Sequence, residues 1–281
     1  MNADTKKLEE SIKRSRRGTI KIATQSKSTV AIRLTLISLI VLTVYGFLTF
    51  NYRGLNFWEA VADTLRNVVT MFGQPALSNV SFTAVLYALV VTFAMAILST
   101  IFGSAIAFFG ALLCAQNIAR QGVSLVVRSI AALTRAIPAI LWVLIFSVAA
   151  GLGSVAAVAG LTLACAGYLI KAYSESIEEM DYGCIEALKA SGASYWQIVF
   201  QAIVPASISY LIAWTFVRFE INFSNAIIVG AAAGAGGIGW DLFMAGNFYF
   251  DLRELGFITY VAVVAVVLLE ILATKVKATV K

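Results

Sequence analysis

Three charged residues stand within or beside long apolar stretches of the 281-residue sequence: Arg135, Arg218 and Glu220. A charge without a partner costs several kcal/mol in apolar surroundings, so each of them needs compensation. One interpretation is that Arg218 or Arg135 pairs with Glu220 between helices and stabilises the bundle. The other is that an arginine sets the potential of a water-filled path for an anion, because its planar guanidinium donates several hydrogen bonds. The sequence leaves both interpretations open.

Two asparagines follow Arg218 at helical spacing, Asn222 and Asn225. Residues three, four or seven positions apart lie on one face of a helix, so all three side chains are expected to share a face. Their amides are neutral hydrogen-bonding groups of the kind that a transient oxyanion site could use. We therefore predict that this face lines a translocation path, unless it serves only to bury an ion pair.

Enzyme chemistry is poorly represented in the sequence. There is no histidine, which excludes an imidazole base, a Ser-His-Asp triad and a histidine-ligated metal or haem. The phosphate-binding pattern G-x-x-x-x-G-K-[ST] is absent, so the chain is not expected to hydrolyse ATP. Its three cysteines are far apart and are expected to serve packing. We expect no catalytic residue, no metal site and no cofactor in this chain.

A glycine-rich run at 234–239 matches the dinucleotide pattern G-x-G-x-x-G letter for letter. That pattern binds a dinucleotide only after a β-strand and before a helix, whereas here it follows an apolar, helix-length stretch. Its glycines are instead expected to break the helix or to allow close backbone packing, namely Gly234, Gly236, Gly237 and Gly239.

The composition places these residues in a membrane protein. Hydrophobic residues make up 60% of the chain and charged residues 13%, against about 45–50% and about 25% in soluble domains. Because a helix needs roughly 20 apolar residues to cross the bilayer, the uncharged intervals predict an all-α protein with six transmembrane helices. The predicted spans are residues 34–52, 81–114, about 125–150 with a kink at Pro138, 154–170, 206–229 and 255–273.

The uncharged interval 67–119 is the difficult one. Its first part, with Gly73-Gln74-Pro75, is predicted to be an interfacial loop, and Ser81 to Cys114 could form one long helix or two short ones. One helix puts both termini and most basic residues on the same side, which the positive-inside tendency favours. The sequence thus divides into a basic cytoplasmic tail at 1–33, a first span at 34–52 and a core at 81–276.

The tail is not a cleavable signal peptide, because a long polar stretch precedes the first apolar one. It is expected to lie along anionic headgroups of the lipid bilayer. The tail and the topology account for most of the net charge of +6, so no nucleic-acid partner is expected.

An acidic loop at about 175–201 is the second functional candidate. Asp181-Tyr182-Gly183 predicts a turn, Glu186 to Ser191 favours a helix, and Gly192 breaks it before the apolar run that begins at Tyr195. A short helix parallel to the membrane could dock into a groove on another protein or simply rest on headgroups.

This loop resembles a signature of ATP-binding-cassette importer permeases. Glu186, Ala187, Leu188, Gly192 and Pro205 stand at the spacing of E-A-A-x-x-x-G-x9-I-x-L-P, with Leu188 at the position of the second alanine. The resemblance implies a type I importer permease architecture in which this segment is the cytoplasmic coupling helix that docks into the ATPase subunit.

Three further stretches resemble phosphonate-type permeases: Arg135 to Trp142, Glu175 to Asp181, and Arg218 to Asn222 followed by the glycine run. The resemblance implies a permease in the inner membrane with both termini cytoplasmic. Its implied partners are a second permease chain in a homodimer, two cytoplasmic ATPase subunits that bind ATP and Mg, and an external binding protein. The implied cargo is a phosphorus oxyanion, such as phosphonate or phosphite.

Two alternatives remain at this point: an ATP-driven permease for a different small solute, and an ion-coupled secondary transporter. Secondary transporters usually contain internal repeats with paired broken helices. The two halves of this sequence show no convincing repeat.

Overall fold

The structure, a computed structural model, describes residues 27–49 and 56–280, and these are helical or irregular throughout, without a strand. The chain divides into two units, residues 1–61 and 62–281, with the boundary inside helix α3. The first unit contributes α2 (Lys27–Thr49). It starts before the predicted span at 34–52, of which residues 50–52 lie outside the described part, as do residues 1–26 of the predicted tail.

The remaining helices and π-helical turns (η) follow in this order: α3 (Phe57–Gly73), α4 (Phe82–Cys114), α5 (Gln121–Ala136), α6 (Ala139–Ala150), α7 (Ser154–Glu178), α8 (Tyr182–Ala190), α9 (Tyr195–Ile198), η1 (Val199–Ile203), α10 (Val204–Ala232), α11 (Gly237–Phe243), η2 (Met244–Phe248) and α12 (Leu252–Val280).

The described part contains five single helices that are long and apolar enough to cross a membrane, or six spans if the bent pair α5–α6 counts as one. This all-helical arrangement agrees with the predicted fold class. The uncharged stretch after Ser81 forms one helix, α4, whose first turn is capped by the Ser81 hydroxyl accepting from the N–H of Ala84 (3.3 Å).

One local prediction is wrong: residues 67–73 do not form an interfacial loop but the second half of α3, an amphipathic helix that carries Glu59, Asp63 and Arg66 among its apolar side chains. The kink predicted at Pro138 is confirmed, and the two helices that meet there, α5 and α6, are bent by 90°.

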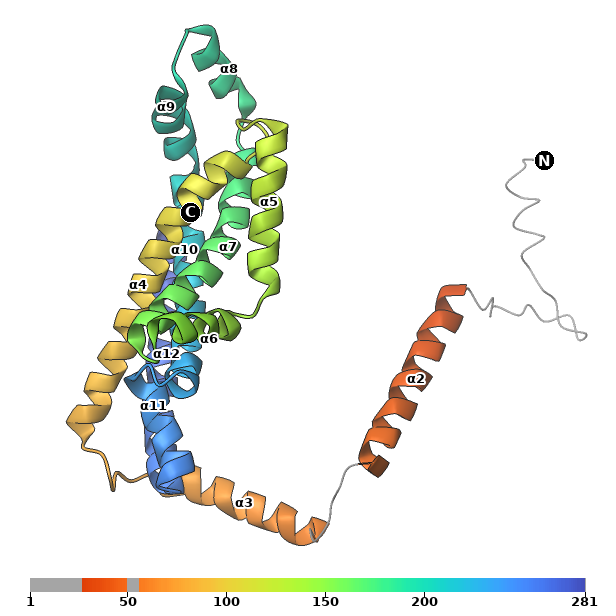
Figure 1. Cartoon of the computed structure of the whole chain (residues 1–281), viewed down its shortest axis with the longest axis vertical. Helices are drawn as coiled ribbons and strands as arrows, with labels where there is room; N and C mark the ends of the chain where they lie inside the picture. Colours follow the sequence, from red (N-terminus) through yellow and green to blue (C-terminus); the bar gives the residue numbers. More distant parts are fainter. Residues whose placement is uncertain (1–26, 50–55, 281) are drawn as a thin grey trace, which may run out of the picture. The chain divides into compact units, whose positions relative to one another are not determined.

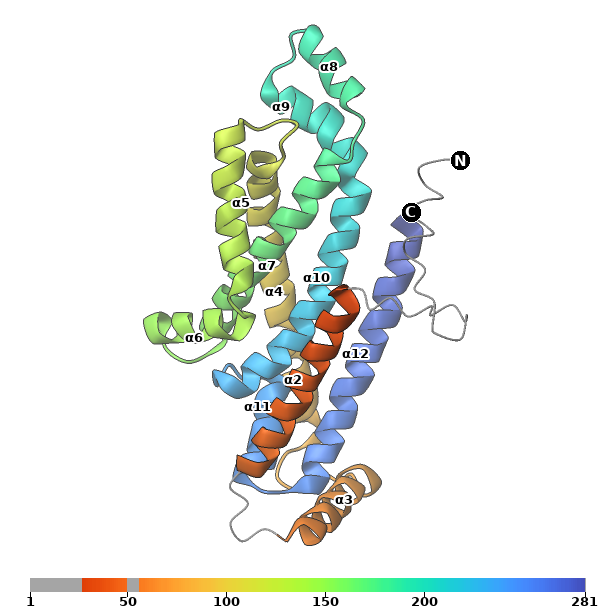
Figure 2. The ribbon, with the colours of Figure 1, turned by 90° about the vertical axis from the view of Figure 1, so that its right-hand side faces the viewer.

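Helix α7 is at the centre of the second unit and contacts α4, α5, α6 and α10 (Figure 1). Small residues make these contacts close: a Cβ added to Gly160 would lie 2.5 Å from the backbone nitrogen of Val143 on α6. Close approach of backbones is how membrane helices gain packing energy without a hydrophobic driving force. Helices α8 and α9 lie at one end of this bundle, and α11 and the start of α12 lie at the other (Figure 2).

Candidate functional site

Helix α8 contains the first three positions of the permease signature, Glu186, Ala187 and Leu188, and local interactions define both of its ends. Asp181 is the N-cap, and its carboxylate accepts from the N–H of Gly183 (3.0 Å). The predicted turn at 181–183 is therefore the cap and the first residues of the helix. At the other end Gly192 has φ of +79°, its N–H donates to the carbonyl of Lys189 and the N–H of Ala193 donates to that of Leu188. This is a Schellman motif, in which glycine ends a helix without steric cost.

The two faces of α8 differ in character. Ile185 is fully buried, and Leu188 packs beside it against a cluster that includes Ile177 and Ile198. Leu188 therefore points inward, which explains why a large apolar residue fits where the signature has alanine. Seven residues of α8 are exposed, and four of them are small: Gly183, Cys184, Ala187 and Ala190. The other three are Tyr182, Glu186 and Lys189.

The chain returns to the bundle through α9 and the π-helical turn η1. Ser194 and Gln197 form a capping box at the start of α9, with the N–H of Ser194 donating to Oε1 of Gln197 (2.7 Å). Pro205 then lies in the first turn of α10, where its missing N–H is tolerated. Trp196 and Phe200 stack with centroids 6.0 Å apart and are both exposed. An exposed aromatic pair beside α8 suits a lipid headgroup layer or a protein partner.

A mixed polar and apolar hollow of about 820 Å³ opens between the end of α7, α8, η1 and the start of α10. It brings together three of the signature positions, Ala187, Leu188 and Pro205, whereas Glu186 and Gly192 do not line it. Glu179, Asp181 and Tyr210 also line it and provide polar groups. Three of the five signature residues thus meet at one recess beside α8.

Glu178, at the end of α7, ties this region to the rest of the bundle. Its carboxylate forms a salt bridge with Arg128 of α5 and accepts from the N–H of Gln116 (2.6 Å). At the neighbouring residues, the side-chain amide of Asn117 donates to the carbonyl of Ile177 (2.8 Å). The sequence shows Glu178 only as one of several acids in a loop, and the pairing with Arg128 could not be read from it.

A second hollow, of about 370 Å³, lies at the bend between α5 and α6, and we call it the arginine hollow. It is lined by Thr134, Arg135, Ile137, Pro138, Ala139, Ala164, Tyr168, Arg218 and Asn225. Four predicted site residues from different parts of the sequence thus meet here: Arg135, Pro138, Arg218 and Asn225. The bend itself is held by Trp142, whose indole N–H donates to the carbonyl of Thr134 (3.0 Å).

Arg218 is 7% exposed, and its guanidinium carbon lies 5.2 Å from the centroid of the Tyr168 ring. Its Nε finds no hydrogen-bond acceptor among the described residues. The contact found for Arg135 is a hydrogen bond from its Nε to the carbonyl of Ala131 (3.3 Å). The ion pair of either arginine with Glu220 therefore stays a prediction.

Asn222 lies at a contact between helices. It is fully buried, its amide donates to the hydroxyl of Thr100 on α4 (2.9 Å), and it is not among the lining residues of the arginine hollow. Its place on a translocation path stays a prediction. The shared helix face is real, but packing divides it between a helix contact at Asn222 and the hollow at Arg218 and Asn225.

The glycine run reverses the chain between α10 and α11. Gly236 and Gly237 have φ of +79° and +72°, which side chains with a Cβ rarely adopt. A Cβ on Gly239 would lie 1.8 Å from the carbonyl oxygen of Ile227, so α11 packs directly on the α10 backbone. The N–H of Ile238 donates to the hydroxyl of Thr92 on α4 (2.9 Å). The run joins three helices and does not form a dinucleotide site.

Sequence reasoning missed Glu254, in the first turn of α12. Its side chain is fully buried, and one oxygen, Oε1, accepts from the N–H groups of Asn79 (3.0 Å) and Val80 (2.7 Å). The other, Oε2, accepts from the side-chain amide of Asn79 (2.7 Å). The carboxylate therefore connects the start of α12 to the segment that leads into α4. Acidic residues are common in first turns, so the sequence carried no sign of this role.

Two aspartates near this end have shifted pKa values. Asp251 caps α12 with Oδ1, which accepts from the N–H groups of Arg253 (2.9 Å) and Glu254 (3.1 Å). These hydrogen bonds, that of Glu254 foremost, hold the pKa of Asp251 below its usual range. Burial raises the pKa of Asp241 on α11, and the nearby negative charge of Glu254 raises it further.

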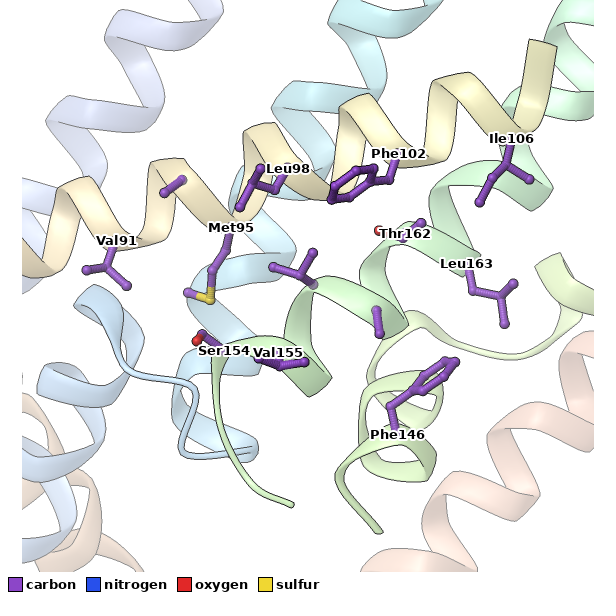
Figure 3. A pocket seen from close by; sticks show the side chains of 13 residues that line it. Val91, Met95, Leu98, Phe102, Ile106, Phe146, Ser154, Val155, Thr162 and Leu163 are labelled. Atoms are coloured by element: carbon purple, nitrogen blue, oxygen red, sulfur yellow. The ribbon is translucent and has the colours of Figure 1, made fainter. Parts of the chain in front are cut away.

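A third hollow is apolar. It has about 750 Å³ between α4, α6 and α7, and Figure 3 shows Leu98, Phe102 and Phe146 around it, with the hydroxyls of Ser154 and Thr162 as labelled polar groups. No charged residue lines it. It is therefore unsuited to an ion, in contrast to the arginine hollow.

Solved structures with the same fold include transporters. The structure superposes on a chain of the inward-facing MetNI methionine ABC transporter with a TM-score of 0.65 at 23% identity, covering 73% of this chain and 100% of that one. A second match is a chain from the crystal structure of an amino acid ABC transporter with histidines. The TM-score is 0.57 at 16% identity, and the superposition covers 80% of this chain and 99% of that one. These likenesses establish the fold.

Curated relatives are similar over about two thirds of this chain. The phosphate-import permease protein PhnE of Mycolicibacterium smegmatis is 29% identical over 183 residues, 65% of this chain and 33% of the relative. The putative phosphite transport system permease protein HtxC of Stutzerimonas stutzeri is 34% identical over 183 residues, 65% of this chain and 62% of the relative. The chain thus spans less than two thirds of either relative.

The family described as binding-protein-dependent transport system inner membrane component matches residues 107–277, which include α8, the arginine hollow and the glycine run. This range is more than half of the chain. The protein therefore belongs to the family of binding-protein-dependent transport system inner membrane components.

Proposed function

We propose that the chain is the permease subunit of an ATP-driven importer that passes a phosphorus oxyanion, such as phosphate, phosphite or a phosphonate, into the cytoplasm. The observation that carries the proposal is α8, a helix capped at both ends, buried on its Ile185 side and presenting small residues outward. Such a face suits insertion into a groove of another protein. The names of the relatives, with phosphate and phosphite among their solutes, support the choice of cargo.

The proposed complex contains this chain, a second copy of it, two cytoplasmic ATPase subunits and an external binding protein. ATP and Mg would be held by the ATPase subunits, since the chain has no phosphate-binding motif of its own. Lys189 lies in the last turn of α8, and Arg128 pairs with Glu178 at the end of α7 that leads into α8. By the positive-inside tendency these basic residues favour a cytoplasmic location for that end, and the basic residues of the two termini favour the same side. Membership of the family of binding-protein-dependent transport system inner membrane components argues against an ion-coupled secondary transporter.

A permease of this type performs no covalent chemistry. It must adopt two conformations that the ATPase subunits bind with different affinity in their ATP-bound and ATP-free states. A force on α8 would be transmitted inward by two connections: the apolar contacts of Ile185 and Leu188, and the salt bridge from Glu178 to Arg128. Because Arg128 lies on α5, motion at α8 would reach the α5–α6 bend and the arginine hollow.

Substitution at Gly192 tests this function. A Cβ at this position would meet no atom within 4 Å, so a bulky side chain would project outward from the end of α8 and not into the bundle. We expect Gly192→Phe to insert normally into the membrane and to lower uptake of labelled phosphite by about tenfold or more, as when a contact worth about 1.4 kcal/mol is lost. Co-purification of the ATPase subunit should fall in parallel.

Gly192→Asn is the matched control, because asparagine tolerates the left-handed conformation that costs other residues about 1–2 kcal/mol. It should retain uptake and co-purification. Normal uptake by a correctly inserted Gly192→Phe variant would refute the coupling role of α8.

A further inference from the structure

We propose that the arginine hollow is an anion-binding station on the transport path, where a small oxyanion is held by Arg218, Arg135 and the amino end of α6. This inference rests on the proposed function and deepens it, because it assigns the selectivity for anions to residues inside the membrane chain. Three observations carry it: the charge of the lining residues, the unsatisfied nitrogen of Arg218 and the orientation of α6.

The lining residues of the hollow carry two positive charges and no negative one. Arg135 comes from the end of α5 and Arg218 from the middle of α10, and no Asp or Glu is among the nine residues. Glu220 is two positions from Arg218 on the same helix, which puts it about 200° around the helix axis, on the other side of α10. Arg218 is buried and Arg135 is exposed, and a hollow lined by two arginines and no carboxylate attracts an anion.

Arg218 is buried, and one of its N–H groups lacks an acceptor among the described residues. Its side chain is 93% buried, one face of the guanidinium lies over Tyr168, and Nε has no acceptor among the described residues. Burying a cation with an unsatisfied N–H is costly, and the cost is removed when an acceptor with negative charge arrives. The planar fork of an arginine matches two oxygens of a tetrahedral oxyanion.

Helix α6 adds a third positive group. Its N-cap is Pro138, and Pro138 and Ala139 both line the hollow, so the 12-residue helix begins there. The N–H groups of Leu141 and Trp142 donate to the carbonyl of Pro138, which leaves the two preceding N–H groups without an acceptor inside the helix. The indole of Trp142 holds the bend through the carbonyl of Thr134, so this helix start is fixed at the hollow. Broken membrane helices use such ends to bind anions.

The same groups predict which solutes are rejected. Asn225 and the hydroxyl of Thr134 complete the polar lining, and no carboxylate is available to accept from an ammonium group. A zwitterionic amino acid would bring its ammonium group beside two arginines. The hollow is therefore selective for small oxyanions such as phosphate, phosphite or methylphosphonate over amino acids.

Thiol labelling of the purified complex measures the potential in the hollow directly. Asn225→Cys is introduced together with Cys184→Ser, because Cys184 is the exposed native thiol and Cys114 and Cys165 are buried. Reaction rates are compared for an anionic and a cationic methanethiosulfonate reagent. We expect the anionic reagent to react faster by about tenfold or more, an advantage that Arg218→Gln should largely remove. Arg66→Gln, which removes an exposed arginine of α3, should leave the ratio unchanged.

Protection by a solute tests binding itself. Sodium phosphite should slow the labelling severalfold relative to sodium chloride at equal ionic strength, and methionine should not. Equal rates for the two reagents, or no more protection by phosphite than by chloride, would overturn the proposal. If Asn225→Cys fails to assemble, Thr134→Cys places a thiol in the same hollow and the same outcomes apply.

The two proposals fail in different ways. A Gly192→Phe variant that transports normally would refute the coupling role of α8, whatever the labelling shows. A different result would refute only the anion station: Gly192→Phe loses uptake, but the thiol in the hollow reacts equally fast with both reagents and phosphite does not slow its labelling. Protection by phosphite that persists in the uncoupled Gly192→Phe variant would support the station independently of transport.

Discussion

Replacing Glu254 gives a sharp test of how the end of the bundle opposite α8 is held together. Its carboxylate is fully buried and accepts three hydrogen bonds, two from the N–H groups of Asn79 and Val80 and one from the Asn79 amide. Glu254→Ala removes every acceptor at once and leaves a space. Glu254→Gln keeps an oxygen for the two backbone N–H groups, and the Asn79 amide can turn to present its own oxygen to the new NH₂ group.

The expected loss in the free energy of unfolding follows from the number of hydrogen bonds to the carboxylate and from how exposed they are. A hydrogen bond to a charged group contributes about 1.5–3 kcal/mol, so three would give about 4.5–9 kcal/mol in a dry site. Asn79 is exposed, and water can replace part of what is lost. Removing the carboxylate also relieves the cost of burying its charge. We therefore expect Glu254→Ala to cost about 3–5 kcal/mol and Glu254→Gln about 1–2 kcal/mol.

Two measurements check this. Denaturant titration in mixed micelles gives the free energy of unfolding, and hydrogen exchange reports the N–H groups of residues 79 and 80 separately. Exchange at these two amides should become much faster in Glu254→Ala and change little in Glu254→Gln, while the amides of α8 stay unaffected in both. Equal losses in the two variants would refute the reasoning, since it attributes the stability to acceptor oxygens and not to charge alone.

Two further predictions concern the same end of the bundle. Gly239→Ala places a Cβ 1.8 Å from the carbonyl oxygen of Ile227, a backbone atom that cannot move aside. We expect the free energy of unfolding to fall by about 1–3 kcal/mol or more, measured by thermal unfolding. In the control Gly246→Ala the new Cβ meets only the side chain of Leu255 at 3.6 Å, so the loss of stability should be small. Because the folded-state pKa of Asp251 is lowered, its contribution to stability is present above its unfolded pKa of about 3.9 and is lost as pH falls through the folded pKa. As pH falls below about 4, unfolding midpoints should thus drop more steeply in the wild type than in Asp251→Asn, which keeps the cap without the charge. Parallel curves would contradict this account.

The sequence by itself determined the helical membrane fold and the position of α8. In a bilayer every backbone group must be satisfied within its own segment, so hydropathy alone predicts helices. The two ends of α8 depend on Asp181 and Gly192, whose interactions reach only a few residues along the chain. Interactions of such short range can be read from spacing.

Local sequence predicts less where short elements share one apolar stretch. The sequence predicts a loop where the structure has the second half of α3. Proline at position 138 predicts that the helix is interrupted but not by what angle, and the structure shows 90°. The bent pair is joined by a hydrogen bond from the indole of Trp142 to the carbonyl of Thr134.

Only the tertiary structure decided which polar residues work together. Arg135 and Arg218 were both recognisable as costly charges, yet their meeting at one hollow depends on how α5 and α10 pack around α7. Asn222 shares a helix face with Arg218 but contacts Thr100 instead, and Glu254 reaches Asn79 across 175 positions of sequence. Periodicity defines the face of a helix, whereas the partner of that face depends on how the helices pack against one another.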